Sequence, residues 1–144
     1  MKEEIKTIAH WPVSTAVGGL HLLGEWYGCN GSDLLLQDAA RLRRLCRKAS
    51  EQAGLTIVGD RFHQLSAPLG VTGTILLAES HLAIHTWSET RFAALDVFVC
   101  NRTRDNRVKA HALYAALRES LAPDNENFLQ VKRGDFVEVT MRTH

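Results

Sequence analysis

Apolar residues recur at every second position, or in short unbroken runs, along most of the chain after residue 18. The runs are rich in Val, Ile, Leu and Thr and are bounded by Gly, Asn or charged residues, which is typical of β-strands rather than helices. We expect strands at 19–29, 55–65, 71–78, through His81 and His85, and at 92–100. In the last of these, alternation places the aliphatic residues on one face, while Asp96 and Cys100 share the other.

Two stretches instead have the three- and four-residue spacing of amphipathic helices. The first covers 33–53, with Ser32 as its N-cap, Asp33 in its first turn and Gly54 beyond its end. The second covers 108–121 and ends before Pro123. Between these elements the pattern predicts a loop at 66–70, and near the C-terminus it predicts a closing hairpin of 128–131 with 136–141 over residues 133–135.

This order of elements predicts an α+β fold. We expect a two-layer α/β sandwich in which two helices cover one face of a mainly antiparallel sheet. The 144 residues suffice for one ordinary hydrophobic core, so 19–144 is interpreted as a single domain. Residues 1–18 have no sustained period and are interpreted as an N-terminal extension.

Composition and charge exclude several classes of protein. The net charge is +1 with both signs interspersed, which gives no footprint for nucleic acid. No apolar run approaches the roughly 20 residues of a membrane helix, so we expect a cytoplasmic protein with no membrane partner. The cysteines Cys29, Cys46 and Cys100 form no Cys-x-x-Cys pair and are expected to be free thiols.

Reactive side chains are concentrated between residues 76 and 100. They are Ser80, His81, His85, Trp87, Glu89, Asp96 and Cys100. On a helix the two histidines would align for zinc, but on a strand they are separated by about 13 Å, so we expect no metal site. Ser80 lacks the small neighbours of a serine-hydrolase elbow, and a lone His or Cys is more often a buried structural residue. The residues by themselves mark a candidate site without fixing its chemistry.

A resemblance to a known family gives the cluster a specific interpretation. Residues 79–87 read Glu-Ser-His-Leu-Ala-Ile-His-Thr-Trp, preceded by Gly-Val-Thr-Gly at 70–73 and followed by Ala-Ala-Leu-Asp-Val-Phe-Val-Cys at 93–100. This combination resembles the short prokaryotic S-adenosylmethionine decarboxylase proenzymes, which cleave themselves and depend on a pyruvoyl group. The likeness covers about residues 19–101, and the family's two-layer sandwich agrees with the fold expected from the pattern.

The resemblance implies that the chain cuts itself between Glu79 and Ser80. Residues 1–79 would become the β chain, and 80–144 the α chain, with a covalent pyruvoyl group made from Ser80 at its N-terminus. That group would form a Schiff base with the substrate, so neither pyridoxal phosphate nor a metal is expected. By the same resemblance His85 is the proton acceptor in processing, Thr72 assists it, and Cys100 is the proton donor in decarboxylation.

The implied substrate is S-adenosylmethionine, which would lose CO₂ to give the decarboxylated product used in spermidine biosynthesis. Glu89 would hold the ribose hydroxyls, and Trp87 and Phe62 would shape the adenine side. The implied working unit is a dimer of cleaved αβ pairs, with residues of both protomers around each site.

The chain also departs from the family's pattern. Where the family usually reads Thr-Trp-Pro-Glu and then a Tyr-Gly-Tyr type segment, this chain has Ser88 in place of the proline, and Arg91 adds a cation. Pyruvoyl-dependent decarboxylation of ornithine or arginine on the same scaffold is therefore an alternative. A non-enzymatic domain that binds a small molecule or a metal is a third possibility.

Overall fold

The computed structural model describes residues 5–7, 18–134 and 140–142. These residues form eight strands and three helices. The strands are β1 (Ile5–Thr7), β2 (Gly19–Tyr27), β3 (Ile57–Ser66), β4 (Leu69–Leu77), β5 (Ser80–Trp87), β6 (Phe92–Cys100), β7 (Asn125–Arg133) and β8 (Thr140–Arg142). The helices are α1 (Asp33–Gln37), α2 (Ala39–Gln52) and α3 (Arg107–Leu121).

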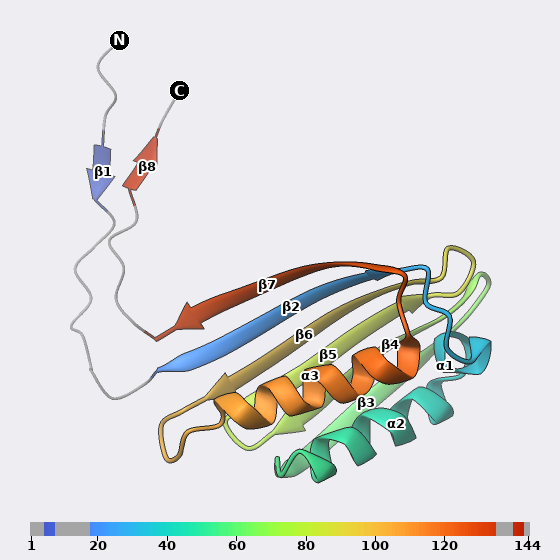
Figure 1. Cartoon of the computed structure of the whole chain (residues 1–144), viewed down its shortest axis with the longest axis horizontal. Helices are drawn as coiled ribbons and strands as arrows, with labels where there is room; N and C mark the ends of the chain where they lie inside the picture. The colour runs from blue at the N-terminus through green and yellow to red at the C-terminus, as the bar shows by residue number, and fades with distance from the viewer. Residues whose placement is uncertain (1–4, 8–17, 135–139, 143–144) are drawn as a thin grey trace.

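Six strands form one antiparallel sheet in the order β3-β4-β5-β6-β2-β7 (Figure 1). Consecutive hairpins build β3 to β6, and β2 is inserted between β6 and the last strand of the sheet. The short strands β1 and β8 pair with each other in a separate antiparallel ribbon. Strands from the two ends of the sequence thus lie beside the central hairpins.

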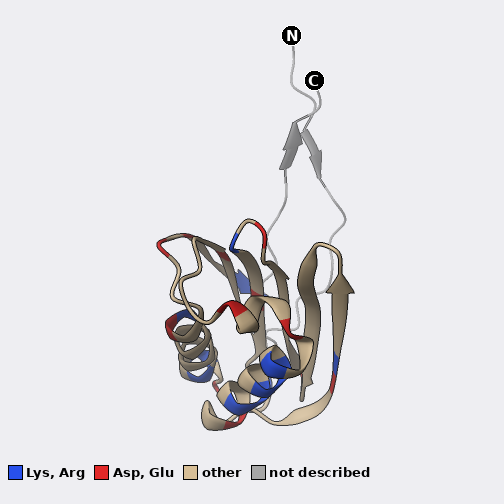
Figure 2. Ribbon diagram, turned by 90° about the vertical axis from the view of Figure 1, so that its right-hand side faces the viewer, with Lys and Arg blue, Asp and Glu red and all other residues tan. Residues whose placement is uncertain are grey.

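All three helices lie on the same side of the sheet, as Figures 1 and 2 show from two directions. The core lies between these layers, because the inward residues of β2, β4, β5 and β6 are almost fully buried under α2 and α3. Lys and Arg positions are frequent on α2 and α3 (Figure 2). We call the opposite, helix-free side of the sheet the open face.

The structure confirms the two-layer α+β sandwich and the expected strands, with ends shifted by up to two residues. The loop expected at 66–70 is shorter, because β3 continues to Ser66 and β4 begins at Leu69. Its shortening places Leu69 and Gly70 in a strand.

The single helix expected at 33–53 was wrong. Asp38 has an extended backbone conformation, with φ −115° and ψ 110°, which separates α1 from α2. The Asp38 carboxylate accepts hydrogen bonds from the backbone N–H groups of Ala40 and Arg41, so it caps α2. Ser32 stands at the N-cap of α1 but makes no capping hydrogen bond through its side chain.

The expected closing hairpin differs as well. Residues 125–133 form one longer strand, β7, whose partner is β2. Residues 135–139 lie outside the described part of the chain, and Thr140–Arg142 pairs with β1. Within the described ranges, no helix is long and apolar enough to cross a membrane.

Candidate active site

Ser80 stands at the first residue of β5, directly after a two-residue turn from β4. The turn residue before it, Glu79, has φ +64°, a left-handed conformation that costs a non-glycine residue about 1 kcal/mol or more. The backbone N–H of Cys100 donates a hydrogen bond of 3.2 Å to Ser80 Oγ. Antiparallel pairing of β5 with β6 therefore brings Ser80 and Cys100 together across 20 residues of sequence. We call these two residues the serine end.

A second pair of predicted residues meets further along the same strands. Thr72 on β4 and His85 on β5 are register partners, and Thr72 Oγ1 lies 3.3 Å from His85 Nδ1, within hydrogen-bonding distance. The His85 ring lies beside Trp87, which in turn contacts Phe92. All of these side chains point to the open face. We call Thr72, His85, Trp87 and Glu89 the histidine end.

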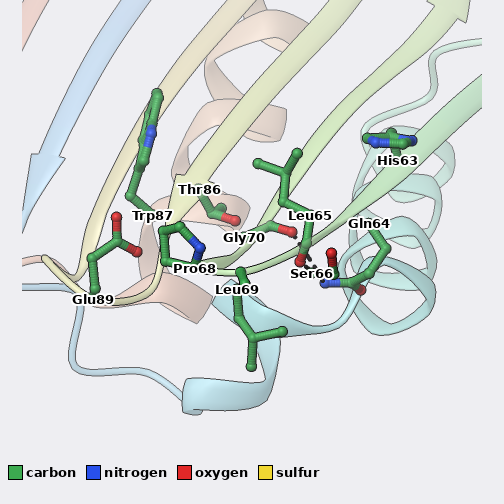
Figure 3. Close-up of a pocket in the computed structure, with 11 residues that line it drawn as sticks. His63, Gln64, Leu65, Ser66, Pro68, Leu69, Gly70, Thr86, Trp87 and Glu89 are labelled. Atoms are coloured by element: carbon green, nitrogen blue, oxygen red, sulfur yellow. Dashed lines mark hydrogen bonds between the residues drawn. The ribbon is translucent and has the colours of Figure 1, made fainter.

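A cavity of about 380 Å³ lies at the histidine end (Figure 3). The turn between β3 and β4 forms one wall, and Trp87 and Glu89 form the other. The lining residues are His63, Gln64, Leu65, Ser66, Ala67, Pro68, Leu69, Gly70, Thr86, Trp87 and Glu89. The cavity thus combines an aromatic ring, aliphatic side chains and a carboxylate, a combination suited to a ligand that has both a flat apolar part and hydroxyl groups.

Phe62 is not part of this arrangement. It is the register partner of Gly73 on β4, and its ring lies where a side chain at Gly73 would be. It packs against the core on the helix-covered face. The predicted contact between Phe62 and a ligand at Trp87 is therefore not supported, because the sheet separates them.

The serine end and the histidine end are far apart within one chain. Ser80 and His85 are five residues apart on a continuous strand, and a strand rises about 3.3 Å per residue, so the two positions are about 17 Å apart. A proton transfer needs donor and acceptor within about 3 Å or one bridging water. His85 of the same chain therefore does not reach Ser80.

Between the two ends, the open face carries a polar cluster and a second hollow. His21 on β2 lies with Nε2 3.1 Å from Asp96 Oδ1, and His81 packs edge-on against the His21 ring and beside Phe98. Partial burial and the neighbouring His21 lower the pKa of His81, although Asp96 opposes this effect. The hollow measures about 640 Å³, and it is bounded by strands β5, β6, β2 and β7 and includes His85 and Asp96.

Comparison with known proteins identifies the family. The family model described as S-adenosylmethionine decarboxylase matches residues 20–134. A protein of Methanococcus aeolicus named S-adenosylmethionine decarboxylase proenzyme is 36% identical over 120 residues, which cover 83% of this chain and 97% of that protein. The chain belongs to the S-adenosylmethionine decarboxylase family.

Further relatives agree with this assignment. Proteins of the same name from Thermodesulfovibrio yellowstonii and Clostridium tetani are each 37% identical, over 81% and 82% of this chain and 81% and 88% of theirs. The crystal structure of the adenosylmethionine decarboxylase from Aquifex aeolicus superposes with a TM-score of 0.73 at 30% identity, covering 84% of this chain and 94% of that one. These findings do not support the ornithine or arginine alternative.

The structure explains how the chain accommodates its departures from the family's pattern. Arg91 Nε donates a hydrogen bond of 2.9 Å to the carbonyl of Cys29, and Arg91 Nη2 lies 3.4 Å from the carboxylate of Asp33. The added cation is therefore engaged by Cys29 and by the first residue of α1, and it is not among the residues that line the cavity. Ser88, which replaces the usual proline, donates its backbone N–H to the Leu69 carbonyl at 3.2 Å and so fixes the turn that carries Glu89.

Sequence reasoning missed several residues of this site. Leu65 and Leu69 line the cavity beside Trp87, and the only signal for them was their position next to and within the loop predicted at 66–70. His21 was also missed, because its contact with Asp96 depends on the pairing of β2 with β6. The described residues contain no group of three His, Cys, Asp or Glu side chains placed to hold a metal ion.

Proposed function

We propose that this protein decarboxylates S-adenosylmethionine, giving CO₂ and the decarboxylated product used in spermidine synthesis. The observation that carries the proposal is the serine end: Ser80 follows the strained residue Glu79 and is held by the Cys100 amide. The family membership supplies the activity, and the relatives' common name as proenzymes supports processing of the chain. The three free cysteines suit the reducing cytoplasm.

Self-cleavage would proceed by rearrangement of the Glu79–Ser80 peptide bond. Ser80 Oγ attacks the Glu79 carbonyl carbon and the C–N bond breaks, which leaves an ester and a free amine on Ser80. A base then removes the Ser80 Cα proton, and the Cβ–O bond breaks, releasing Glu79 as a carboxylate. The dehydroalanine that remains tautomerises to an imine, adds water and loses ammonia, leaving a pyruvoyl group. The left-handed backbone at Glu79 favours the first step, because cleavage releases its strain.

The residues around Ser80 fit such a group. The backbone N–H of Cys100 contacts Ser80 Oγ, and the thiol on the same residue is almost buried. The pyruvoyl carbonyl supplies an electron sink for the charge left when CO₂ departs. Cys100 would donate the proton that completes the product, while Glu89 and Trp87 bind the ribose and the adenine.

The separation of the two ends leads to a more specific proposal. Because His85 lies about 17 Å from Ser80 along β5, the base that acts on Ser80 is supplied by a second copy of the chain. In such a dimer, Ser80 and Cys100 of one protomer meet Thr72, His85, Trp87 and Glu89 of the other. Two equivalent composite sites then follow from the twofold symmetry that most homodimers have.

The open face suits this assembly. It carries no helix of the described chain, and it presents apolar side chains at Leu23, Phe98, Leu129 and Val131. The hollow of about 640 Å³ and His85 of the histidine end lie on it. A partner sheet laid against this face would bury these side chains and enclose the reacting groups.

The activity is tested by the mass of the purified protein together with CO₂ release from carboxyl-labelled S-adenosylmethionine, ornithine and arginine. We expect two fragments divided before residue 80, the C-terminal one starting with a pyruvoyl group, and release from S-adenosylmethionine alone. The Ser80→Ala variant should stay uncut and inactive. A continuous chain with full activity would contradict the proposal, and release from ornithine or arginine would change the substrate.

The composite site is tested by co-expressing two inactive variants with different tags. Ser80→Ala and His85→Ala each lack one half of a site, and a mixed dimer restores one complete site. We expect the His85→Ala chain to be cut only when the Ser80→Ala chain is present. Co-expression of Ser80→Ala with Cys100→Ala is the matched control for turnover, because both changes fall in the same half and no complete site can form. If the His85→Ala chain stays uncut in a mixed dimer isolated by its two tags, the proposal that each site combines residues of two protomers is wrong.

A further inference from the structure

We propose that Arg104 and Lys109 form a binding site for the chain end that cleavage creates at Glu79. The proposal rests on the proposed self-cleavage, and it assigns these two cations to a step after the cut. They would hold the new C-terminus of the first fragment beside the position that it occupied before the cut.

The site is a hollow of about 300 Å³ on the flank of the serine end. The end of β4, the segment after α2 and the start of α3 meet there. Its lining residues are Gly54, Leu55, Thr56, Ala78, Glu79, Thr103, Arg104, Asn106 and Lys109. Glu79, which would carry the new carboxylate, therefore already lines the hollow.

The chain leading to Glu79 is held against β3 and the residue before it. Leu77 pairs with Ile57 on β3, and the N–H of Ala78 donates a hydrogen bond of 2.9 Å to the carbonyl of Thr56. These contacts all lie within the first fragment, so breaking the Glu79–Ser80 bond does not remove them. After cleavage, the only freed residue of this fragment is Glu79 itself.

The two cations are free to take up the new charge. Neither Arg104 nor Lys109 has an ion-pair partner among the described residues, whereas Asp105 is engaged by Arg107 at 2.6 Å. The aliphatic part of Lys109 lies against Gly54, with Cε 3.5 Å from an ideal Cβ at that glycine. The lysine is half-buried, and its position is supported by packing.

The charges match once the bond is broken. Before cleavage Glu79 brings one carboxylate to the hollow, and afterwards it brings its side chain and a new terminal carboxylate, opposite one guanidinium and one ammonium. The Arg104 side chain can engage a carboxylate through two N–H groups. Retention there would keep the anionic chain end away from the site, which must accept the carboxylate of the substrate.

The test compares cut and uncut protein carrying the same changes. Arg104→Gln with Lys109→Gln is made in the self-cleaving chain and in the uncut Ser80→Ala chain, and melting temperatures are measured at one protein concentration. We expect the double change to lower the melting temperature of the cut form by about 3 °C more than that of the uncut form. Arg102→Gln, an exposed arginine of the same loop outside the hollow, is the control and should affect both forms equally.

An equal effect on both forms would overturn the proposal. A second measurement needs no change to the cations: 0.5 M NaCl should lower the melting temperature of the cut wild type relative to the uncut Ser80→Ala chain, because salt screens exposed charges. An identical salt response would also overturn it. If the wild-type chain is not cut at all, as judged by its mass, the proposed function fails instead, and the two failures are distinguishable.

Discussion

At the scale of single residues, Cys100 contacts Ser80 through one group and is proposed to act in the reaction through another. The group that contacts Ser80 is the backbone amide of Cys100, which every residue type except proline retains. The Cys100 thiol is therefore available for a different task. The other two cysteines are buried elsewhere in the core, and burial raises the pKa of the Cys46 thiol to about 12.

Replacing Cys100 by alanine should leave self-cleavage largely intact and reduce turnover. The amide that holds Ser80 remains, while the proton donor is lost, which costs on the order of 100-fold or more in rate. Intact mass measures the first property and CO₂ release the second. Cys46→Ala is the control: it creates a small core cavity, and turnover per folded molecule should be unchanged. A Cys100→Ala enzyme with wild-type turnover would remove this residue from the reaction.

His81 should make the protein less stable in mild acid. Burial, together with His21 on β2, lowers its pKa below the usual 6.5, while Asp96 on β6 raises it and Arg133 on β7 lowers it further. Below pH 6.5 the unfolded chain therefore binds a proton more readily than the folded one, so this contribution to stability is complete above pH 6.5 and is lost as the pH falls toward the folded pKa. Urea unfolding between pH 8 and 5 should show a shallower decline for His81→Gln than for the wild type. Parallel curves would show that another group causes the decline.

The places of Ser80, His85 and Cys100 on two neighbouring strands were predictable, because all three lie in the stretch whose unusual sequence resembles the family. The face of Phe62 was not. A register irregularity between Ile57 and Gly59 breaks the alternation at the start of β3, so counting alternate positions along the sequence does not give the face. Only the pairing of Phe62 with Gly73 settles which side of the sheet it occupies.

At the scale of secondary structure, the break between α1 and α2 shows what the pattern does not reveal. The hydrophobic spacing of 33–53 fits one helix, but Leu36 rather than Leu35 is buried, because Asp38 resets the helical phase. The carbonyl of Leu36 accepts a hydrogen bond of 2.9 Å from the buried Thr86 side chain on β5. This long-range contact stabilises the break, and nothing local in the sequence encodes it.

Asp38→Ala should destabilise the protein by about 1 kcal/mol. The change removes the carboxylate that caps Ala40 and Arg41, and the loss of such a cap typically costs about 0.5–2 kcal/mol. Ser32→Ala is a matched control, because Ser32 stands at an N-cap without a capping hydrogen bond and should change stability much less. Chemical denaturation of both variants measures the difference. Equal losses would mean that the Asp38 cap contributes little.

At the scale of the whole molecule, the sequence predicts one layer of helices on one sheet but leaves the other face unexplained. The two halves of the candidate site lie about 17 Å apart along β5, so one chain holds no complete site. No pattern within one chain indicates what lies against this face. A self-association of this face would complete the site.

Leu129→Asp should weaken self-association and reduce both cleavage and turnover. Leu129 is 63% exposed on β7, on the same face as its partner Leu23, and a buried unpaired carboxylate there would oppose association. Val108→Asp is the matched control, since Val108 is 81% exposed but lies on α3, in the helical layer. Sedimentation at several concentrations should show a shift to monomer for the first variant only. If both variants sediment alike and are cut equally, the open face is not the interface.

The order of the strands has a consequence for a chain that is cut before residue 80. The first fragment supplies β3, β4 and β2 and the second supplies β5, β6 and β7, so β2 lies between two strands of the other fragment. Once such a molecule is denatured, its recovery requires two separate polypeptides to find each other, and the rate becomes second order. Dilution would then slow the refolding of the mature protein but not that of its precursor, so the irreversible cut is best made only after the precursor has folded.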